Sequence, residues 1–330
     1  TVIAKASEET SLIAFKAVGL FFNHGLPKDA LHLLLGDGRV GQAIITSQAL
    51  DLVVFTGSLK TAKSIHNSLS NKPGKIVPLI AETGGLNSMV VDSSALIERA
   101  CDDIMRSAFN SAGQRCSALR LLLVHETIYE ELILMLKGMM SELIIGNPSN
   151  SSVDMGPIIS VEAAQELYDY INRSDPERLA IFQPQAPDEH RKQWFLPTLI
   201  ELKSINTLNE EKFGPILHVL KFSEKTLDSH LEQITAKGFG LTFGIHTRID
   251  AKAIHASKLV SAGNTYINRD IIGAVVESQP FGGKNLSGTG FKAGGPNYLM
   301  QFTDERTISI NTVAIGGNAE LLNQASEDAP

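Results

Sequence analysis

The sequence predicts an α/β fold with more than one domain, and three observations support this. Short apolar runs alternate with amphipathic stretches along most of the chain, which is the pattern of parallel strands joined by crossover helices. At 330 residues, the chain exceeds what one hydrophobic core comfortably supports. Some apolar runs also end in glycine turns that lead into helices, as at Gly36–Gly38.

Residues 1–84 have the pattern of half a doubly wound nucleotide-binding domain rather than a whole one. One predicted helix, 11–23, carries Ile13, Ala17, Leu20 and Phe21 on one face. The other predicted elements of this part are strands 2–4, 32–35 and 52–55, a short helix after Gly38, a helix over 58–69 and an extended stretch over 76–81.

Strands and helices continue to alternate after Gly85. The predicted strands are 88–91, 119–124, 218–222, 242–246 and 265–268, and the predicted helices are 94–110, 126–143, 161–172, 227–236 and 251–260. Residues 174–194 are charged and proline-rich, which predicts a surface excursion. The glycine-rich stretch 281–296 has no period and must be a loop that folds over something. Residues 307–313 alternate like a solvent-facing strand.

Composition excludes several classes of protein. A net charge of −7 argues against a nucleic-acid or anionic-membrane surface, so small diffusing substrates are the better expectation. The two cysteines, Cys101 and Cys116, have no disulfide or zinc spacing, and the histidines form no metal-binding pattern, so we expect no metal and a reducing cytoplasm. No apolar run reaches 18 residues. Because the chain starts with Thr1, we expect it to be part of something longer.

A thiol and a distant carboxylate suggest covalent catalysis, with Cys116 attacking and Glu82 activating water. A lone cysteine is more often an inert core residue. Here Gly113 and Ser117 leave room for a ligand, and a nearby Arg115 would favour the thiolate.

Five sequence blocks resemble the signatures of the aldehyde dehydrogenase superfamily, in that superfamily's order. The blocks are FTGS (55–58), ETGG (82–85), GQRCSA (113–118), EEKFGP (210–215) and PFGG (280–283). The sequence flanking these blocks also resembles the carboxy-terminal dehydrogenase domain of bifunctional proline utilisation A proteins. That resemblance implies oxidation of L-glutamate γ-semialdehyde, the open form of pyrroline-5-carboxylate, to L-glutamate.

The resemblance also implies a domain plan. Residues 1–84 would be the second half of an NAD-binding domain, 85–296 a catalytic domain, and 297–330 a C-terminal segment whose strand pairs with another subunit of a homo-oligomer. The part missing from the amino end would contain a FAD-dependent proline dehydrogenase domain.

The chemistry implied by the resemblance runs through Cys116. Its thiolate attacks the aldehyde, the thiohemiacetal passes hydride to the nicotinamide, and Glu82 then activates the water that hydrolyses the thioester. The developing oxyanion needs a backbone N–H and a side-chain amide. In the superfamily that amide precedes the lysine matched by Lys5, so we expect these 330 residues alone to be weak or inactive.

The expected cofactor is NAD. Gly57 and Ser58 end a strand and open a helix whose N-terminus can receive a pyrophosphate, although an ordinary βα connection explains them equally well. The resemblance assigns the adenosine ribose to Lys5 and Glu8, and a carboxylate there favours NAD over NADP. It assigns the nicotinamide ribose to Glu211 and Phe213.

The resemblance also implies the substrate contacts. Ser117, Gly273 and Ala274 would hold the α-carboxylate of glutamate semialdehyde, and Phe281 would form an aromatic wall. Two alternatives stay open. The aldehyde could be another semialdehyde, such as succinate semialdehyde, or the chain could be a non-catalytic binding or oligomerising module.

Overall fold

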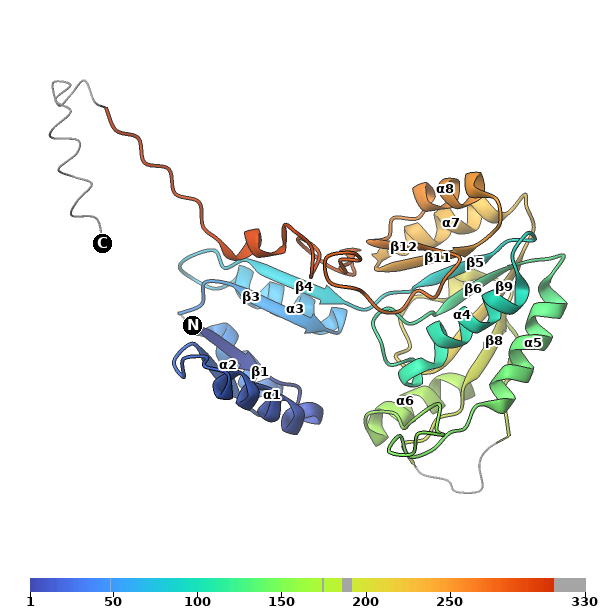
Figure 1. Cartoon of the computed structure of the whole chain (residues 1–330), viewed down its shortest axis with the longest axis horizontal. Helices are drawn as coiled ribbons and strands as arrows, with labels where there is room; N and C mark the ends of the chain where they lie inside the picture. Colours follow the sequence, from blue (N-terminus) through green and yellow to red (C-terminus); the bar gives the residue numbers. More distant parts are fainter. Residues whose placement is uncertain (48, 174, 186–191, 312–330) are drawn as a thin grey trace.

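The strands of the molecule fall into two parts, residues 1–83 and a larger body built on one seven-stranded sheet (Figure 1). The computed structural model describes residues 1–47, 49–173, 175–185 and 192–311. Within those residues it is a mixed α/β structure with a central, mainly parallel sheet, as the sequence predicts. None of the described helices is long and apolar enough to cross a membrane.

The first part contains two separate pairs of parallel strands rather than one continuous half-sheet. The pairs are β1 (Val2–Lys5) with β2 (Leu31–Leu34), and β3 (Val53–Gly57) with β4 (Leu79–Thr83). The helices of this part are α1 (Ser11–Asn23), α2 (Gly38–Thr46) and α3 (Leu59–Ser70). The bounds of α1 match the prediction, but α1 has no buried residue, so its apolar face is open to solvent in this chain.

The larger part is a seven-stranded sheet with the order β12-β11-β5-β6-β9-β8-β7. All neighbouring strands run parallel except the edge pair β7 and β8. The strands are β5 (Ser88–Val91), β6 (Leu121–His125), β7 (Arg178–Phe182), β8 (Thr198–Leu202), β9 (Ile216–Phe222), β11 (Thr242–His246) and β12 (Asn264–Ile267).

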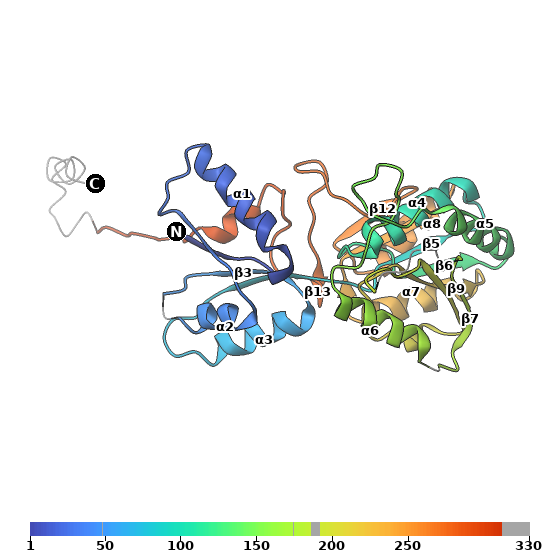
Figure 2. The ribbon, with the colours of Figure 1, turned by 90° about the horizontal axis from the view of Figure 1, so that it is seen from below.

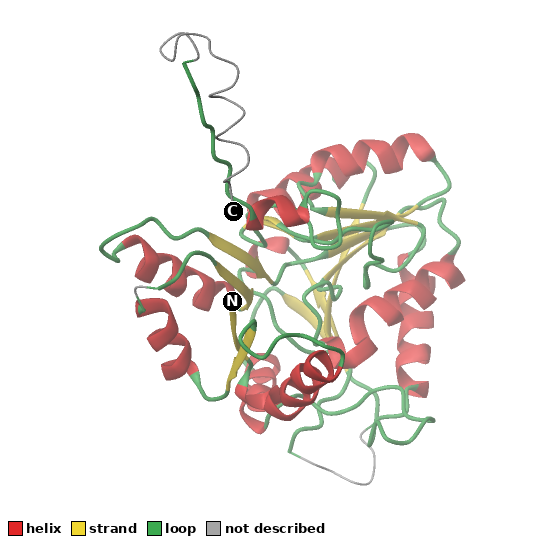
Figure 3. Cartoon of the chain, turned by 60° about the vertical axis from the view of Figure 1, so that its left-hand side comes forward, coloured by secondary structure: helices red, strands yellow, loops and turns green. Residues whose placement is uncertain are grey.

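Helices cover both faces of this sheet, so the part has three layers (Figure 3). Side chains alternate along each strand. Met89 and Val91 therefore join the core under α4 and α5, while Val90 joins the core under α6, α7 and α8. The helices are α4 (Ile97–Phe109), α5 (Tyr129–Glu142), α6 (Val161–Asn172), α7 (Leu227–Ala236) and α8 (Asp250–Leu259). Short 3₁₀ turns occupy Glu8–Thr10, Asn110–Gly113, Ile205–Thr207 and Tyr298–Phe302.

Two predicted stretches differ from the structure. The supposed surface excursion over 174–194 contains β7, which pairs antiparallel with β8 at the sheet edge. Side chains of an edge strand are mostly exposed, and this weakens the apolar signal. Residues 307–311 belong to no strand and run away from the body in Figure 1, while 312 and 313 lie outside the described residues. A segment without a hydrogen-bonded neighbouring strand does not count as a β-strand, even where its side chains alternate.

The predicted loop 281–296 does fold over something: the end of β4. Ala81 N donates to Thr289 Oγ1 at 2.8 Å, and Thr83 N donates to Ser287 O at 3.0 Å. Within the loop, β13 (Lys284–Asn285) pairs with β10 (Phe239–Gly240) of the larger part. Figure 2 shows the loop lying between the two parts, so it ties one to the other.

Candidate active site

The candidate site lies where the carboxyl end of β4 meets the amino ends of the seven-stranded sheet. Glu82 is the last but one residue of β4, and the chain passes through Gly84 and Gly85 directly into β5. Cys116 stands five residues before β6, which is the neighbour of β5 in the sheet. The connection between the two parts therefore carries the predicted base toward the predicted nucleophile.

Glu82 has an environment suited to proton transfer. Its Oε2 accepts a hydrogen bond from Gly283 N at 2.9 Å, within the loop that folds over β4. Burial raises the pKa of Glu82 to about 7, against the lowering effects of the Gly283 N–H and the charge of Lys292. A carboxyl group with a pKa near the working pH can accept and release a proton efficiently.

The thiol of Cys116 is half-buried and lies in the electric field of two carboxylates. Burial raises its pKa most, and the charges of Glu211 and Glu82 raise it further. The backbone N–H groups of Ser117 and Cys116 itself act in the opposite direction. Glu82 thus lies close enough to Cys116 to act on its ionisation.

The structure gives Arg115 a contact other than the expected one. Its Nε donates to Ser111 Oγ at 3.0 Å, within the same loop. The pKa of Cys116 is raised rather than lowered. The exposed guanidinium bends back along its own loop instead of reaching the sulfur.

A left-handed turn leads from α4 to the stretch that carries Cys116. Ser111, Ala112 and Gly113 have φ values of 55°, 53° and 64°. Gly113 has no room for a side chain, because an added Cβ would lie 2.3 Å from Gly214 O. Non-glycine residues rarely adopt this conformation, and they persist in it only when the surroundings impose it. The turn therefore sets where the Cys116 loop begins.

Asn87 fixes the other end of that loop, and the sequence reasoning missed it. This buried side chain donates from Nδ2 to Cys116 O at 2.7 Å and to Ala118 O at 2.9 Å. Its Oδ1 accepts from Thr242 N at 3.1 Å, so one amide joins the loop to β11. Its position in the sequence, as a polar residue between the ETGG block and an apolar strand, could have indicated this role.

Arg120 is the second residue that the sequence reasoning missed. It is only 1% exposed, and its Nη2 and Nε lie 3.0 and 3.2 Å from Glu211 Oε1. Glu211 also packs against Gly84, where an added Cβ would lie 1.6 Å from Oε2. Burial raises the pKa of Glu211, and Arg120 counters that effect. The Arg120 guanidinium lies 5.4 Å from the ring centre of half-exposed Phe213.

The residues predicted to hold the adenosine ribose are clustered. Lys5 Nζ lies 3.2 Å from Glu8 Oε2. Hydrogen bonding to the backbone N–H of Glu8 and to Lys5 lowers the pKa of Glu8, while the carboxylate of Asp37 acts against it. Asp37, the N-cap of α2, is therefore a second carboxylate at this place. The sequence reasoning did not identify it.

The predicted pyrophosphate position has the expected backbone. β3 ends at Gly57, and Ser58 is the N-cap of α3. Ser58 Oγ accepts from Thr61 N at 3.2 Å, so its hydroxyl caps its own helix. A phosphate at this place would rely on the other free N–H groups of the first turn.

The predicted substrate residues come from three stretches. Ser117 is buried in the nucleophile loop, whereas Gly273 and Ala274 are exposed, with Gly273 at a φ of 83°. The stretch that carries them is anchored to α4, because Ile271 N donates to Ser107 Oγ at 3.1 Å. Phe281 forms a bridge with Ala293 in the loop over β4. Convergence of these residues on one carboxylate stays a prediction.

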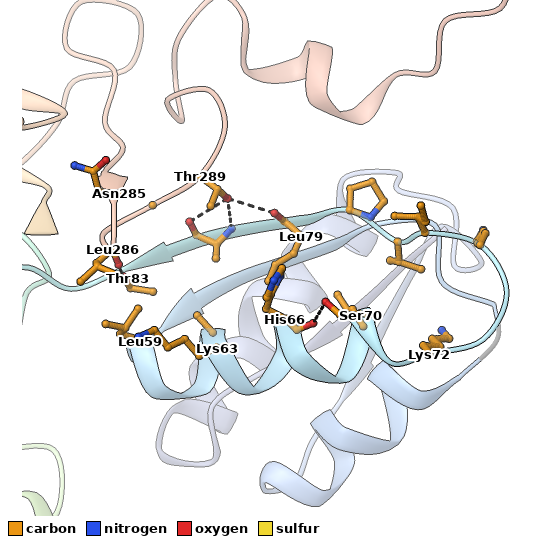
Figure 4. A pocket seen from close by; sticks show the side chains of 18 of the residues that line it. Leu59, Lys63, His66, Ser70, Lys72, Leu79, Thr83, Asn285, Leu286 and Thr289 are labelled. Atoms are coloured by element: carbon orange, nitrogen blue, oxygen red, sulfur yellow. Dashed lines mark hydrogen bonds between the residues drawn. The ribbon is translucent and has the colours of Figure 1, made fainter. Parts of the chain in front are cut away.

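A large cavity of about 550 Å³ lies near this site but is not part of it. Ala81 and Thr83 of β4 line it, together with residues of α3 and with Asn285, Leu286, Gly288 and Thr289 (Figure 4). Because side chains alternate along a strand, Glu82 points to the opposite face of β4. Among the described residues, no three His, Cys, Asp or Glu side chains are grouped to hold a metal ion.

Comparison with known proteins places the chain in a family. The model of the "Aldehyde dehydrogenase family" matches residues 1–308. The chain is 46% identical over 329 residues to "Bifunctional protein PutA" of Rhizobium meliloti, covering 98% of this chain and 27% of that protein. It is 33% identical over 316 residues to a "1-pyrroline-5-carboxylate dehydrogenase" of Geobacillus sp., covering 94% of this chain and 61% of that one.

Solved structures agree with these relatives. A crystal structure of bifunctional proline utilization A superposes with a TM-score of 0.91 at 48% identity, over 96% of this chain and 32% of that chain. A 1-pyrroline-5-carboxylate dehydrogenase from Thermus with bound NAD superposes with a TM-score of 0.85 at 29% identity, over 92% of this chain and 59% of that one. The chain thus spans about a quarter of the curated PutA relatives it matches.

Proposed function

This chain belongs to the aldehyde dehydrogenase family, and we propose that it forms the catalytic part of an NAD-dependent enzyme that oxidises L-glutamate γ-semialdehyde to L-glutamate. Two kinds of relative support the substrate, the PutA proteins and the 1-pyrroline-5-carboxylate dehydrogenases. The presence of Cys116 and Glu82 in one site, with a Glu82 pKa of about 7, carries the proposal.

In the proposed reaction each residue has a defined task. The Cys116 thiol loses its proton to solvent, and the thiolate attacks the aldehyde carbon. Bound NAD would supply the acceptor for the hydride that leaves that carbon. Glu82 then takes a proton from water, which attacks the thioester on Cys116 and releases the carboxylate product. Asn87 holds the backbone of the Cys116 loop, so that its N–H groups stay fixed while charge develops on the substrate oxygen.

The charges at the adenosine end favour NAD over NADP. The negative charge of Asp37 raises the pKa of Glu8, and a 2′-phosphate bound at this place would add further negative charge. Lys5 Nζ is paired with Glu8, which leaves the lysine less able to compensate for that phosphate. The residues present therefore fit an unphosphorylated ribose.

The whole protein would contain more than these residues. The proposed remainder is an amino-terminal region with a FAD-dependent proline dehydrogenase, in a cytoplasmic homo-oligomer. The amide that completes the oxyanion site is expected in that region, and losing one such donor typically costs about 10²–10³ in rate. Residues 1–330 alone should accordingly be weak or inactive.

The test uses the intact protein and a panel of aldehydes with NAD or NADP. Glutamate semialdehyde with NAD should give the highest kcat/KM, and Cys116→Ala should abolish NADH formation. Cys101→Ala is the matched control, because Cys101 is fully buried under α5 and burial raises the pKa of its thiol to about 12. Full turnover in Cys116→Ala would refute the mechanism, and a clear preference for succinate semialdehyde would refute the substrate.

A further inference from the structure

We propose that Arg120 is a positioning residue that locks the Cys116 loop to the segment carrying Glu211 and Phe213, and that it supplies the counter-charge for Glu211 near Cys116. This inference rests on the proposed function, because it assigns a task within the same site. Arg120 stands two residues after the end of the GQRCSA block.

All three nitrogen atoms of the Arg120 guanidinium donate hydrogen bonds. Nη1 donates to Gly214 O at 2.9 Å, and Nη2 donates to Arg115 O at 3.2 Å. Nη2 and Nε both donate to Glu211 Oε1. One guanidinium thus holds the carbonyl next to the nucleophile, a carbonyl of the EEKFGP block and a carboxylate of the same block. A lysine has a single ammonium group and cannot reproduce this planar set of contacts.

The backbone of Arg120 is held as firmly as its side chain. Arg120 N donates to Asn87 O at 2.9 Å, and His218 N donates to Arg120 O at 2.9 Å. These bonds extend the sheet between β5, β6 and β9 at its amino edge. The guanidinium therefore starts from a fixed point, and small shifts of the Cys116 loop relative to Glu211 must break its hydrogen bonds.

Charged groups of both signs interact with the Cys116 thiol. Glu211 and Glu82 are the carboxylates that oppose its ionisation, and Arg120 is a buried cation that interacts with it. Arg115 is turned toward Ser111, and Lys292 acts on Glu82. Removing Arg120 would leave Glu211 buried near the thiol without its cationic partner, although the Gly85 N–H still donates to the carboxylate. Removing the charge of Glu211 would have the opposite effect, so the two changes are predicted to shift thiol ionisation in opposite directions.

The experiment measures alkylation of Cys116 by iodoacetamide against pH in the intact protein, with the site of labelling identified by mass spectrometry. Arg120→Met should move the pH profile upward, and a rise of about 1 in the apparent pKa of the thiol would make labelling at pH 8 about tenfold slower. Glu211→Gln should move the profile downward, and the double variant should return close to the wild-type profile. Lys137→Met is the control, because it removes a half-buried cation paired with Glu201, away from the site, and should leave the profile unchanged.

A second variant tests whether a change seen in Arg120→Met comes from the lost charge or from loss of folding. Arg120→Lys keeps the charge but not the planar guanidinium, so it should keep a nearly wild-type labelling profile while raising KM for NAD several-fold more than it lowers kcat. Unchanged profiles in both Arg120→Met and Glu211→Gln would overturn the inference, and so would a shift of the same sign in both. If the wild type is labelled as expected yet oxidises no aldehyde, the proposed function fails while the charge assignment holds.

Discussion

The two parts of the molecule bury apolar side chains very differently. In the larger part β5, β6 and β11 are buried along their whole length. In the first part α1 has no buried residue, and Leu12, Phe15 and Leu20 are 60 to 72% exposed. The buried cluster of the first part consists of Ile45, Val53, Leu69 and Val77.

This contrast divides the candidate site. The proposed nucleophile Cys116 and the two residues that hold its loop, Asn87 and Arg120, come from the densely packed part. Glu82 and the residues predicted to hold the adenosine ribose come from the sparsely packed part. Regions with few buried apolar contacts open at lower free energy than a dense core. We infer that the nucleophile is rigidly placed, whereas the position of the base depends on the loop 281–296 that covers β4.

The largest effect is expected at Glu82, where the first part reaches into the site. Glu82→Gln should lower the rate of thioester hydrolysis by about 10²–10⁴ and leave the first turnover intact. Rapid-mixing measurements should then show a burst of NADH followed by a stall. Glu210→Gln is the matched control, because Glu210 is exposed and paired with Lys212. Steady-state turnover at the wild-type rate in Glu82→Gln would contradict the assignment of the base.

A pair of leucine truncations measures the packing contrast directly. Leu122→Ala, in the middle of β6, should lower the free energy of unfolding by about 2–5 kcal/mol. Leu20→Ala, on α1, should change it by less than about 0.5 kcal/mol in the chain of 330 residues. Chemical denaturation followed by circular dichroism gives both values. A large loss for Leu20→Ala would mean that the apolar face of α1 is covered in solution.

The smallest expected effect is the dependence of stability on pH at Glu82. Its pKa is about 7 in the folded chain, against an ordinary value of 4.5. The unfolded chain therefore releases this proton first, and Glu82 costs stability increasingly as pH rises from about 4.5 to 7. Glu82→Gln should be more stable than the wild type at pH 8, by on the order of 1 kcal/mol once solvent screening is allowed for.

Melting temperatures of the wild type and the variant at pH 4 and pH 8 check this prediction. The difference between them should vanish at pH 4, where the carboxyl group is protonated in both the folded and unfolded chains. A variant that is less stable than the wild type at pH 8 would mean that the Gly283 hydrogen bond outweighs burial.

Local periodicity explains which elements could be predicted. Helices α1, α6 and α7 and strands β5 and β11 have the predicted bounds, because their apolar spacing is set within each segment. Pairing between strands depends on distant residues. Neither the separation of β1–β2 from β3–β4 nor the antiparallel edge strand β7 could be read from spacing.

The same limit applies to the site. Cys116 and Glu82 stand in recognisable blocks, so the sequence indicated both. Asn87 contacts residues 29 to 155 positions away, and Arg120 pairs with Glu211, 91 positions away, which no local pattern reports. The expectation for Arg115 rested on its place beside Cys116 in the chain. In the folded loop its side chain contacts Ser111 instead.

The left-handed turn before the nucleophile restricts which sequences could replace this loop. Position 113 excludes every side chain, because a Cβ would collide with the Gly214 carbonyl. Positions 111 and 112 also have positive φ, which disfavours β-branched residues most and suits glycine or asparagine best. A randomised library over 111–115, selected for activity, should return only glycine at 113, small or Asn side chains at 111 and 112, and wide variety at exposed position 115.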